Sequence, residues 1–183
     1  MYSNDNIGVH TDMEIIENLA IAARRGKKRG LSWGVKADER FRYRQMLAEF
    51  DLGLEDRMSS KVGLLSGGQR QAITLLMATI KKPKLLLLDE HTAALDPKTA
   101  AKVLELSDKI IAENNLTALM VTHNMHDAIT HGNRLIMMSD GKIILDISGE
   151  EKKNLTVEHL LEMFEKASGS KLENDRMLLS KDK

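Results

Sequence analysis

Two short stretches of this sequence place polar side chains and glycines at spacings that suit phosphate chemistry. In the first, Ser66 stands three residues before Gln69, which is the pattern of a capping box at a helix N-terminus. Gly67 and Gly68 lie between them and carry no side chains, so a ligand can approach the backbone closely. The N–H groups and positive dipole end of such a helix bind anions, and phosphate is the usual one.

In the second stretch two adjacent acids, Asp89 and Glu90, follow a run of four leucines at residues 85–88. Such a run is typical of a short strand buried on both faces, as in a parallel sheet flanked by helices. Its last residues would lie at the carboxyl edge of the sheet, where ligands of open α/β folds bind. One acid there can hold magnesium, and the other can act as a base toward an attacking water. Each stretch alone has a simpler explanation: the first could be an ordinary helix cap, and the second a strand that ends in acids by chance. The occurrence of both stretches in this order disfavours that explanation.

Apolar spacing and turn residues predict the elements that position these stretches. A capping box formed by Thr11 and Glu14 predicts the start of one helix, and Pro97 suits the first position of another. Asp140-Gly141 lies between two apolar runs, which indicates a β-hairpin. The remaining expected elements are a charged helix over 37–50, a helix from Ser66 that Pro83 stops, a strand over 116–122, hairpin strands over 134–139 and 142–147, and a last helix between Thr156 and Gly169.

Composition narrows the classes of function. A chain of 183 residues is long enough to bury a proper core. Lys+Arg and Asp+Glu both number 27, so net charge gives no reason to expect a polyanionic partner. There are no cysteines, which excludes a disulfide framework and a thiolate metal site. No apolar run reaches the length of a membrane span, and we expect a soluble protein without a signal peptide.

The stretch from residue 65 to residue 96 resembles the ATPase subunit of ATP-binding cassette (ABC) transporters. The residues around its motifs are most similar to those in the ATPases of bacterial uptake systems. The matching positions are the signature at Leu65, Ser66, Gly67, Gly68 and Gln69, the Walker B strand at 85–89, the catalytic carboxylate at Glu90, the D-loop at Asp96 and the switch histidine at His123.

This resemblance covers nearly everything from about Asp12 onward and implies an α/β fold that is part of an ABC-type P-loop NTPase domain. It implies a helical subdomain with an irregular N-terminus over residues 1–64. The C-terminal part of a RecA-like parallel-sheet lobe would occupy residues 65–169. Residues 170–183 are expected to form a flexible tail.

By resemblance, the family hydrolyses ATP with Mg²⁺ and uses the energy to move a small solute across a membrane. Asp89 would hold Mg²⁺ through water, Glu90 would orient or deprotonate the attacking water, and His123 would contact the γ-phosphate. The signature would act in trans, on ATP held by the opposite subunit of a head-to-tail dimer, and Asp96 would couple the two sites. The implied partners are a second ABC ATPase subunit, a transmembrane permease and a solute-binding protein, without nucleic acid. The implied location is the cytoplasm, peripheral on the inner face of the cell membrane.

A phosphate-binding loop of the form G-x-x-x-x-G-K-[ST] does not occur in the 183 residues. That loop wraps the β- and γ-phosphates and places the lysine and the magnesium. No glutamine precedes Gln45, whereas the family's Q-loop would fall near Ser3 or Asn4. We therefore expect an N-terminally truncated domain that is inactive alone, with an unpaired sheet edge and exposed apolar surface. The alternative is a non-catalytic remnant or a split-gene partner of an intact ABC ATPase, so enzymatic activity stays open.

Three further features have competing interpretations. His91 stands where most of the family carries proline, and we expect a tolerated variant rather than a second proton relay. The basic residues 24–30 suit a solvated loop first, a contact with anionic lipid or a permease second, and nucleic acid third. A chromosome-maintenance or DNA-repair ATPase would share the signature and the Walker B strand, but the long heptad coiled coils of those proteins do not occur in this sequence.

Overall fold

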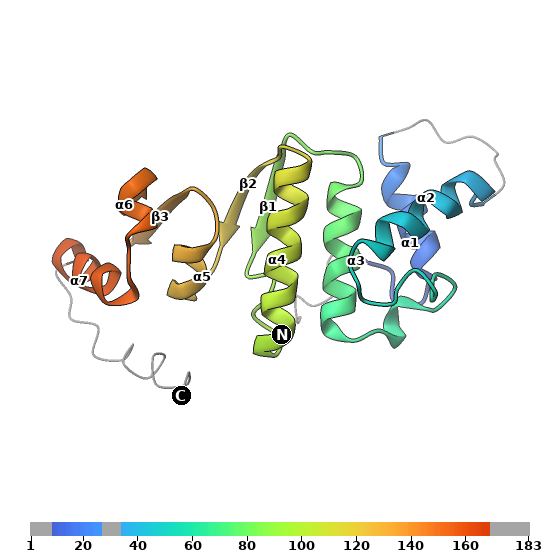
Figure 1. Cartoon of the computed structure of the whole chain (residues 1–183), viewed down its shortest axis with the longest axis horizontal. Helices are drawn as coiled ribbons and strands as arrows, with labels where there is room; N and C mark the ends of the chain where they lie inside the picture. The colour runs from blue at the N-terminus through green and yellow to red at the C-terminus, as the bar shows by residue number, and fades with distance from the viewer. Residues whose placement is uncertain (1–8, 27–33, 169–183) are drawn as a thin grey trace. The chain divides into compact units, whose positions relative to one another are not determined.

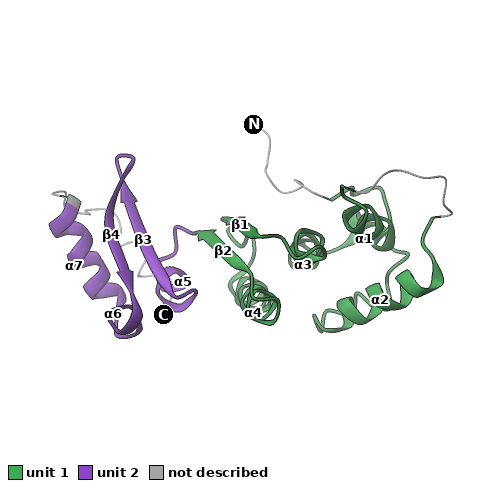
Figure 2. Cartoon of the chain, turned by 90° about the horizontal axis from the view of Figure 1, so that it is seen from above, with its two compact units in different colours: residues 1–121 green, residues 122–183 purple. Residues whose placement is uncertain are grey.

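The computed structural model of the chain describes residues 9–26 and 34–168. The chain divides into two compact units, residues 1–121 (unit 1) and residues 122–183 (unit 2), coloured separately in Figure 2. The predicted domain division at residues 64/65 and 169/170 stays a prediction. The expected tail over 170–183, the predicted helix end at Gly169 and the Q-loop positions Ser3 and Asn4 lie outside the described residues.

The helices of unit 1 share one hydrophobic core. Within the described residues they are α1 (Ile15–Ala23), α2 (Ala37–Ala48), α3 (Gly67–Thr79) and α4 (Pro97–Glu113), with a 3₁₀ turn η1 (Val62–Leu64) before α3 (Figure 1). Fully buried core members include Ile15, Leu19, Leu47 and Ile73.

Helix α1 begins three residues later than predicted. Its N-cap is Glu14 rather than Thr11, and the Glu14 N–H donates to the Glu17 carboxylate at 2.8 Å. Thr11 lies in a turn, where its carbonyl accepts a hydrogen bond from the N–H of Gly63 at 2.8 Å. The predicted start was wrong because the backbone of Thr11 is bound to this later segment, which keeps it outside the helix.

Strands β1 (Leu85–Asp89) and β2 (Thr117–Val121) pair in parallel along all their residues. Helix α4 forms the crossover that a parallel pair requires. It runs alongside the pair in both views (Figures 1 and 2). The buried Leu86 and Leu88 of β1 belong to the same core as Ile110 of α4, so this face of the strands is covered.

The opposite face of the strand pair is open. Leu85 and Leu87 are 51% and 64% exposed, and Leu119 and Val121 of β2 are 52% and 49% exposed. The prediction that the leucine run is buried on both faces is therefore wrong, because the core described for unit 1 covers only the face with Leu86. The apolar surface expected from the sequence is present on this open face.

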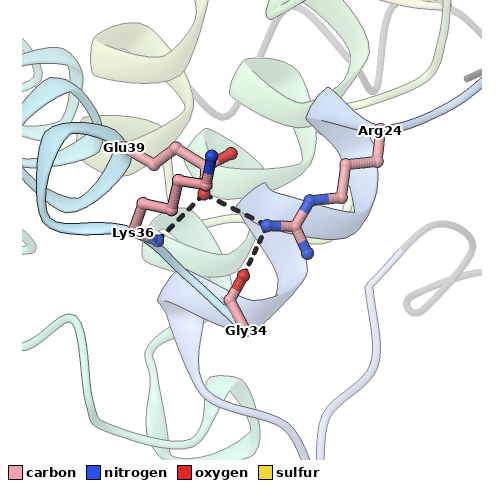
Figure 3. A network of polar contacts seen from close by, with 4 residues as sticks. All are labelled: Arg24, Gly34, Lys36 and Glu39. Atoms are coloured by element: carbon pink, nitrogen blue, oxygen red, sulfur yellow. Dashed lines mark hydrogen bonds and ion pairs between the residues drawn. The ribbon is translucent and has the colours of Figure 1, made fainter. Parts of the chain in front are cut away.

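A polar network fixes the end of α1 relative to the start of α2 (Figure 3). The guanidinium of Arg24, the C-cap of α1, donates to the Gly34 carbonyl and, at 3.1 Å, to the Glu39 carboxylate. The same carboxylate accepts a hydrogen bond at 3.0 Å from the N–H of Lys36, the N-cap of α2. Because Arg24 and Glu39 are partly exposed, the ion pair contributes little energy and mainly sets geometry.

Unit 2 is a β-hairpin with helices packed on it. Strands β3 (Arg134–Ser139) and β4 (Lys142–Ser148) pair antiparallel, and Asp140 and Gly141 form the turn with φ values of 50° and 74°. An Asp-Gly hairpin turn requires such positive φ values, so the predicted hairpin is confirmed. Thr156 caps the last helix, as predicted. The helices are α5 (Met125–Thr130), α6 (Gly149–Lys153) and α7 (Val157–Ser168), and the core of the unit holds Leu135, Ile147, Leu155 and Leu160.

Substitutions on the two faces of β1 should differ in their effect on stability. Leu87→Gln should leave the melting temperature nearly unchanged and reduce self-association, because this side chain lies exposed on an apolar face. Leu88→Ala should lower the free energy of unfolding by about 2–5 kcal/mol, because it opens a cavity in the core. Thermal unfolding and light scattering of both variants check this. A large destabilisation by Leu87→Gln would contradict the open face.

Candidate functional site

The first turn of α3 is built as the sequence predicts. Ser66 is the N-cap, its hydroxyl oxygen accepts from the Gln69 N–H at 3.3 Å, and its own N–H donates to the Gln69 side chain at 3.2 Å. The Gln69 amide also donates to the carbonyl of Leu52 at 3.2 Å, which ties this turn to the preceding loop. On the other side of the cap, Leu65 is buried. The first N–H groups of the helix precede its hydrogen-bond ladder, so this end can receive an anion.

The two glycines of this turn also have a packing reason. A Cβ on Gly68 would lie 2.1 Å from Cγ2 of Thr99, and a Cβ on Gly67 would lie 3.0 Å from Cδ2 of Leu95. Gly68 is buried and Gly67 is exposed. Approach of a ligand to the backbone therefore suits Gly67, whereas Gly68 allows α3 to pack closely on the start of α4.

Asp89 and Glu90 lie at the carboxyl end of β1, as predicted. Asp89 pairs with Val121 of β2, and the Glu90 N–H donates to the Val121 carbonyl at 3.0 Å. Glu90 has a φ of 43°, in the left-handed region that costs a non-glycine residue about 1–2 kcal/mol. Its carbonyl accepts from the Ala93 N–H at 3.0 Å, so hydrogen bonds on both sides hold this strained residue. Strain of this kind collects at functional sites.

His91 is anchored to α4. Its Nε2 lies 3.2 Å from the hydroxyl of the buried Ser107, which itself donates to the Val103 carbonyl at 2.8 Å. Because the Ser107 proton is engaged, its oxygen accepts from the Nε2–H of His91. His91 therefore fastens the residue after Glu90 to the crossover helix, and no local pattern predicts this role.

Asp96 is the N-cap of α4, and Pro97 occupies the first helical position as predicted. The hydroxyl of Thr99 and its N–H, at 3.1 Å from Oδ1, donate to the Asp96 carboxylate and hold its pKa below the usual value. Sequence reasoning missed Thr99, although its spacing from Asp96 is that of a cap and its partner.

His123 lies two residues beyond β2, is exposed, and belongs to unit 2. The predicted contact of His123 with a γ-phosphate stays a prediction. Asn124 next to it caps α5, because its side-chain oxygen accepts from the Asp127 N–H at 3.2 Å.

The structure thus joins the signature turn to the loop before α4, and it joins Asp89 and Glu90 to the end of β2. The loop over residues 90–96 connects the two groups. Among the described residues no three His, Asp or Glu side chains gather as a metal site. A single carboxylate such as Asp89 still suits Mg²⁺, which keeps several waters and takes its other ligands from phosphates.

A family model described as ABC transporter matches residues 2–93, a span that contains the signature, β1 and Glu90. The chain belongs to the ABC transporter family. Its α/β fold is accordingly of the P-loop NTPase type, which confirms the predicted fold class.

Individual relatives agree with this assignment. The tyrosine transport ATP-binding protein of Clostridioides difficile is 45% identical over 167 residues, which is 91% of this chain and 66% of that protein. An aliphatic sulfonates import ATP-binding protein of Paraburkholderia xenovorans is 42% identical over 103 residues, 56% of this chain and 30% of that one.

Among solved structures, the dimeric ATP-binding cassette MJ0796, bound to ADP and Pi in a post-hydrolysis state, is similar with a TM-score of 0.62 and 29% identity. The similarity covers 80% of this chain and 60% of that one. The chain therefore spans less than two thirds of the length of each of these proteins. None of its described helices combines the length and the apolar character that a membrane crossing requires.

The lowered pKa of Asp96 predicts a specific dependence of stability on pH. The folded state binds this proton less tightly than the unfolded state, so the stabilisation is present above the unfolded pKa of about 3.9 and is lost as pH falls through the lower folded pKa. Asp96→Asn should therefore remove part of the acid sensitivity of the free energy of unfolding below about pH 4. Urea unfolding at several pH values checks this, with Glu105→Gln on the exposed side of α4 as the control. Equal acid slopes for wild type and Asp96→Asn would contradict the assignment.

Proposed function

We propose that this chain is the ATP-binding component of an ABC transporter, in which ATP binding and hydrolysis drive uptake of a small solute through a permease. The observation that carries the proposal is that four of the signature residues, Ser66 to Gln69, form the capped first turn of α3, with Leu65 buried just before it. The names of two relatives, which refer to transport of tyrosine and import of aliphatic sulfonates, support a small solute as cargo and uptake as direction.

In this proposal the signature engages the γ-phosphate of ATP held by a second subunit in a head-to-tail dimer. The Ser66 oxygen accepts from the Gln69 N–H, and its O–H proton can go to a phosphate oxygen. The N–H of the exposed Gly67 adds a donor at the positive end of the α3 dipole. The dimeric state of the similar cassette bound to ADP and Pi supports a second ATPase subunit as partner.

The acids at the end of β1 supply the catalytic part of the proposal. Asp89 would hold Mg²⁺ through water, and the ion would neutralise charge on the phosphate oxygens. Glu90 would orient or deprotonate the attacking water, and its backbone, held by hydrogen bonds to β2 and to Ala93, supports a fixed position for that carboxylate. His123 would contact the γ-phosphate, and Asp96 would couple the two sites of the dimer.

We further propose that the 183 residues alone do not hydrolyse ATP at a useful rate. The phosphate-binding loop does not occur among them, and each charge-assisted hydrogen bond to phosphate contributes roughly 1.5–3 kcal/mol. Losing several such bonds removes several decades of affinity, at about 1.4 kcal/mol per decade. The signature cannot replace them, because it acts on the nucleotide of the other subunit.

A second candidate is a non-catalytic remnant or a split-gene product that pairs with an intact ABC ATPase subunit. The open face of β1 and β2 favours it, since Leu85, Leu87, Leu119 and Val121 form an apolar surface that ends beside Asp89. In either form the proposed setting is the inner face of the cell membrane, on a transmembrane permease and with a solute-binding protein where uptake needs one.

Phosphate release by the purified chain tests the proposed inactivity. Wild type and Glu90→Gln should release phosphate from Mg-ATP at the same background rate, because neither holds its own nucleotide firmly. Glu90→Gln is the matched control, since it preserves size and removes the charge. Turnover in wild type that disappears in Glu90→Gln would contradict inactivity and would support the catalytic role of Glu90.

A further inference from the structure

One side chain, Thr99, touches both the signature turn and the D-loop carboxylate. Its methyl carbon Cγ2 lies 2.1 Å from the place that a Cβ on Gly68 would take, so the methyl rests against the Gly68 backbone. Its N–H donates to Oδ1 of Asp96 at 3.1 Å, and its hydroxyl donates to the same carboxylate. The methyl and the hydroxyl are the two branches of one β-carbon, whereas the N–H belongs to the backbone of the same residue.

Because both branches turn together about χ1, they cannot move independently. Thr99 sits in the first turn of α4, where its backbone is held by the cap that Asp96 provides. A shift of the α3 turn that presses on the methyl must either rotate the side chain or displace this turn. Rotation would move the hydroxyl that donates to Asp96, and displacement of the turn would move the N–H that donates to Oδ1.

The neighbouring glycine offers a softer contact. A Cβ on Gly67 would lie 3.0 Å from Cδ2 of Leu95, which is the far end of a flexible side chain and can move away. The stiff connection between α3 and the carboxylate therefore passes through Gly68 and Thr99.

We propose that Thr99 is a positioning residue that couples the signature turn to Asp96, so that displacement of Gly68 toward α4 changes how the carboxylate is held. This inference rests on the proposed roles of the signature and of Asp96. Phosphate engagement at the first turn of α3 would then be reported to the D-loop of the same chain through a single side chain.

A double substitution tests the coupling without nucleotide. Gly68→Ala should lower the melting temperature by at least about 2 °C, and it should shift the NMR signals of the Asp96 carboxyl carbon and the Thr99 amide. Adding Thr99→Ser should restore the melting temperature and return the Asp96 signal toward its original position, because serine keeps the hydroxyl and N–H but lacks the obstructing methyl. Gly34→Ala is the matched control, since a Cβ there meets nothing within 4 Å. If Gly68→Ala alone does not fold, Thr99→Val takes its place: loss of the hydroxyl should move the Asp96 carboxyl and Gly68 amide signals together, and an unchanged Gly68 signal would overturn the coupling.

Two results would overturn the proposal. One is a destabilised Gly68→Ala in which the Asp96 and Thr99 signals do not move, which would reduce the contact to packing alone. The other is a double variant no better than Gly68→Ala, which would show that the Thr99 methyl is not the obstacle. Neither readout needs ATP, so failure here would leave the proposed function standing, and absence of ATP turnover would leave the coupling standing.

Discussion

The close approach of α3 to the start of α4 is the constraint on which the site depends. It exists because residue 68 has no side chain, which leaves room for the Thr99 methyl against the helix backbone. Helix α4 is also the crossover between β1 and β2, so its position and the carboxyl ends of both strands are fixed together. A capped helix N-terminus and a pair of strand-end acids thereby belong to one packed unit rather than to two separate loops.

The loop over residues 90–96 is held in this unit at three points. Its first residue, Glu90, extends the hydrogen bonds of the strand pair through the Val121 carbonyl. The next, His91, is fastened to Ser107 in the middle of α4, and Asp96 is fastened to Thr99 at the start of α4. All three anchors lie within the βαβ unit itself, which explains how a backbone as strained as that of Glu90 persists.

Local patterns predicted much of the fold. The cap at Ser66, the helix start at Pro97 and the turn at Asp140-Gly141 each depend on residues only a few positions apart, and the structure has all three. The errors came from contacts distant in sequence. Thr11 does not cap α1, because its backbone is hydrogen-bonded to a segment beyond residue 60. No local pattern indicates that one face of the leucine run is exposed.

The same distinction holds for the site. The positions of the signature, the acids and Asp96 follow from motif spacing, and the family match covers the first two. The spacing of Thr99 from Asp96 indicates a cap partner, but the contact of Thr99 with Gly68 and the bond of Ser107 with His91 could not be assigned from spacing, because they appear only when α4 lies beside α3 and beside the loop that ends at Asp96. His123 belongs to unit 2, and its contact with a γ-phosphate stays a prediction.

A signature that acts in trans is tested most directly by ATP turnover in a mixture of this chain with a longer relative, for example the 45% identical tyrosine transport ATP-binding protein, in which arginine replaces the residue aligned with Ser66. Only a mixed pair then combines a complete phosphate site with an intact signature. We expect turnover that rises as the wild-type chain is added and stays at background with the Ser66→Arg variant. Turnover that does not respond to the chain, or that rises equally with Ser66→Arg, would contradict a signature acting in trans.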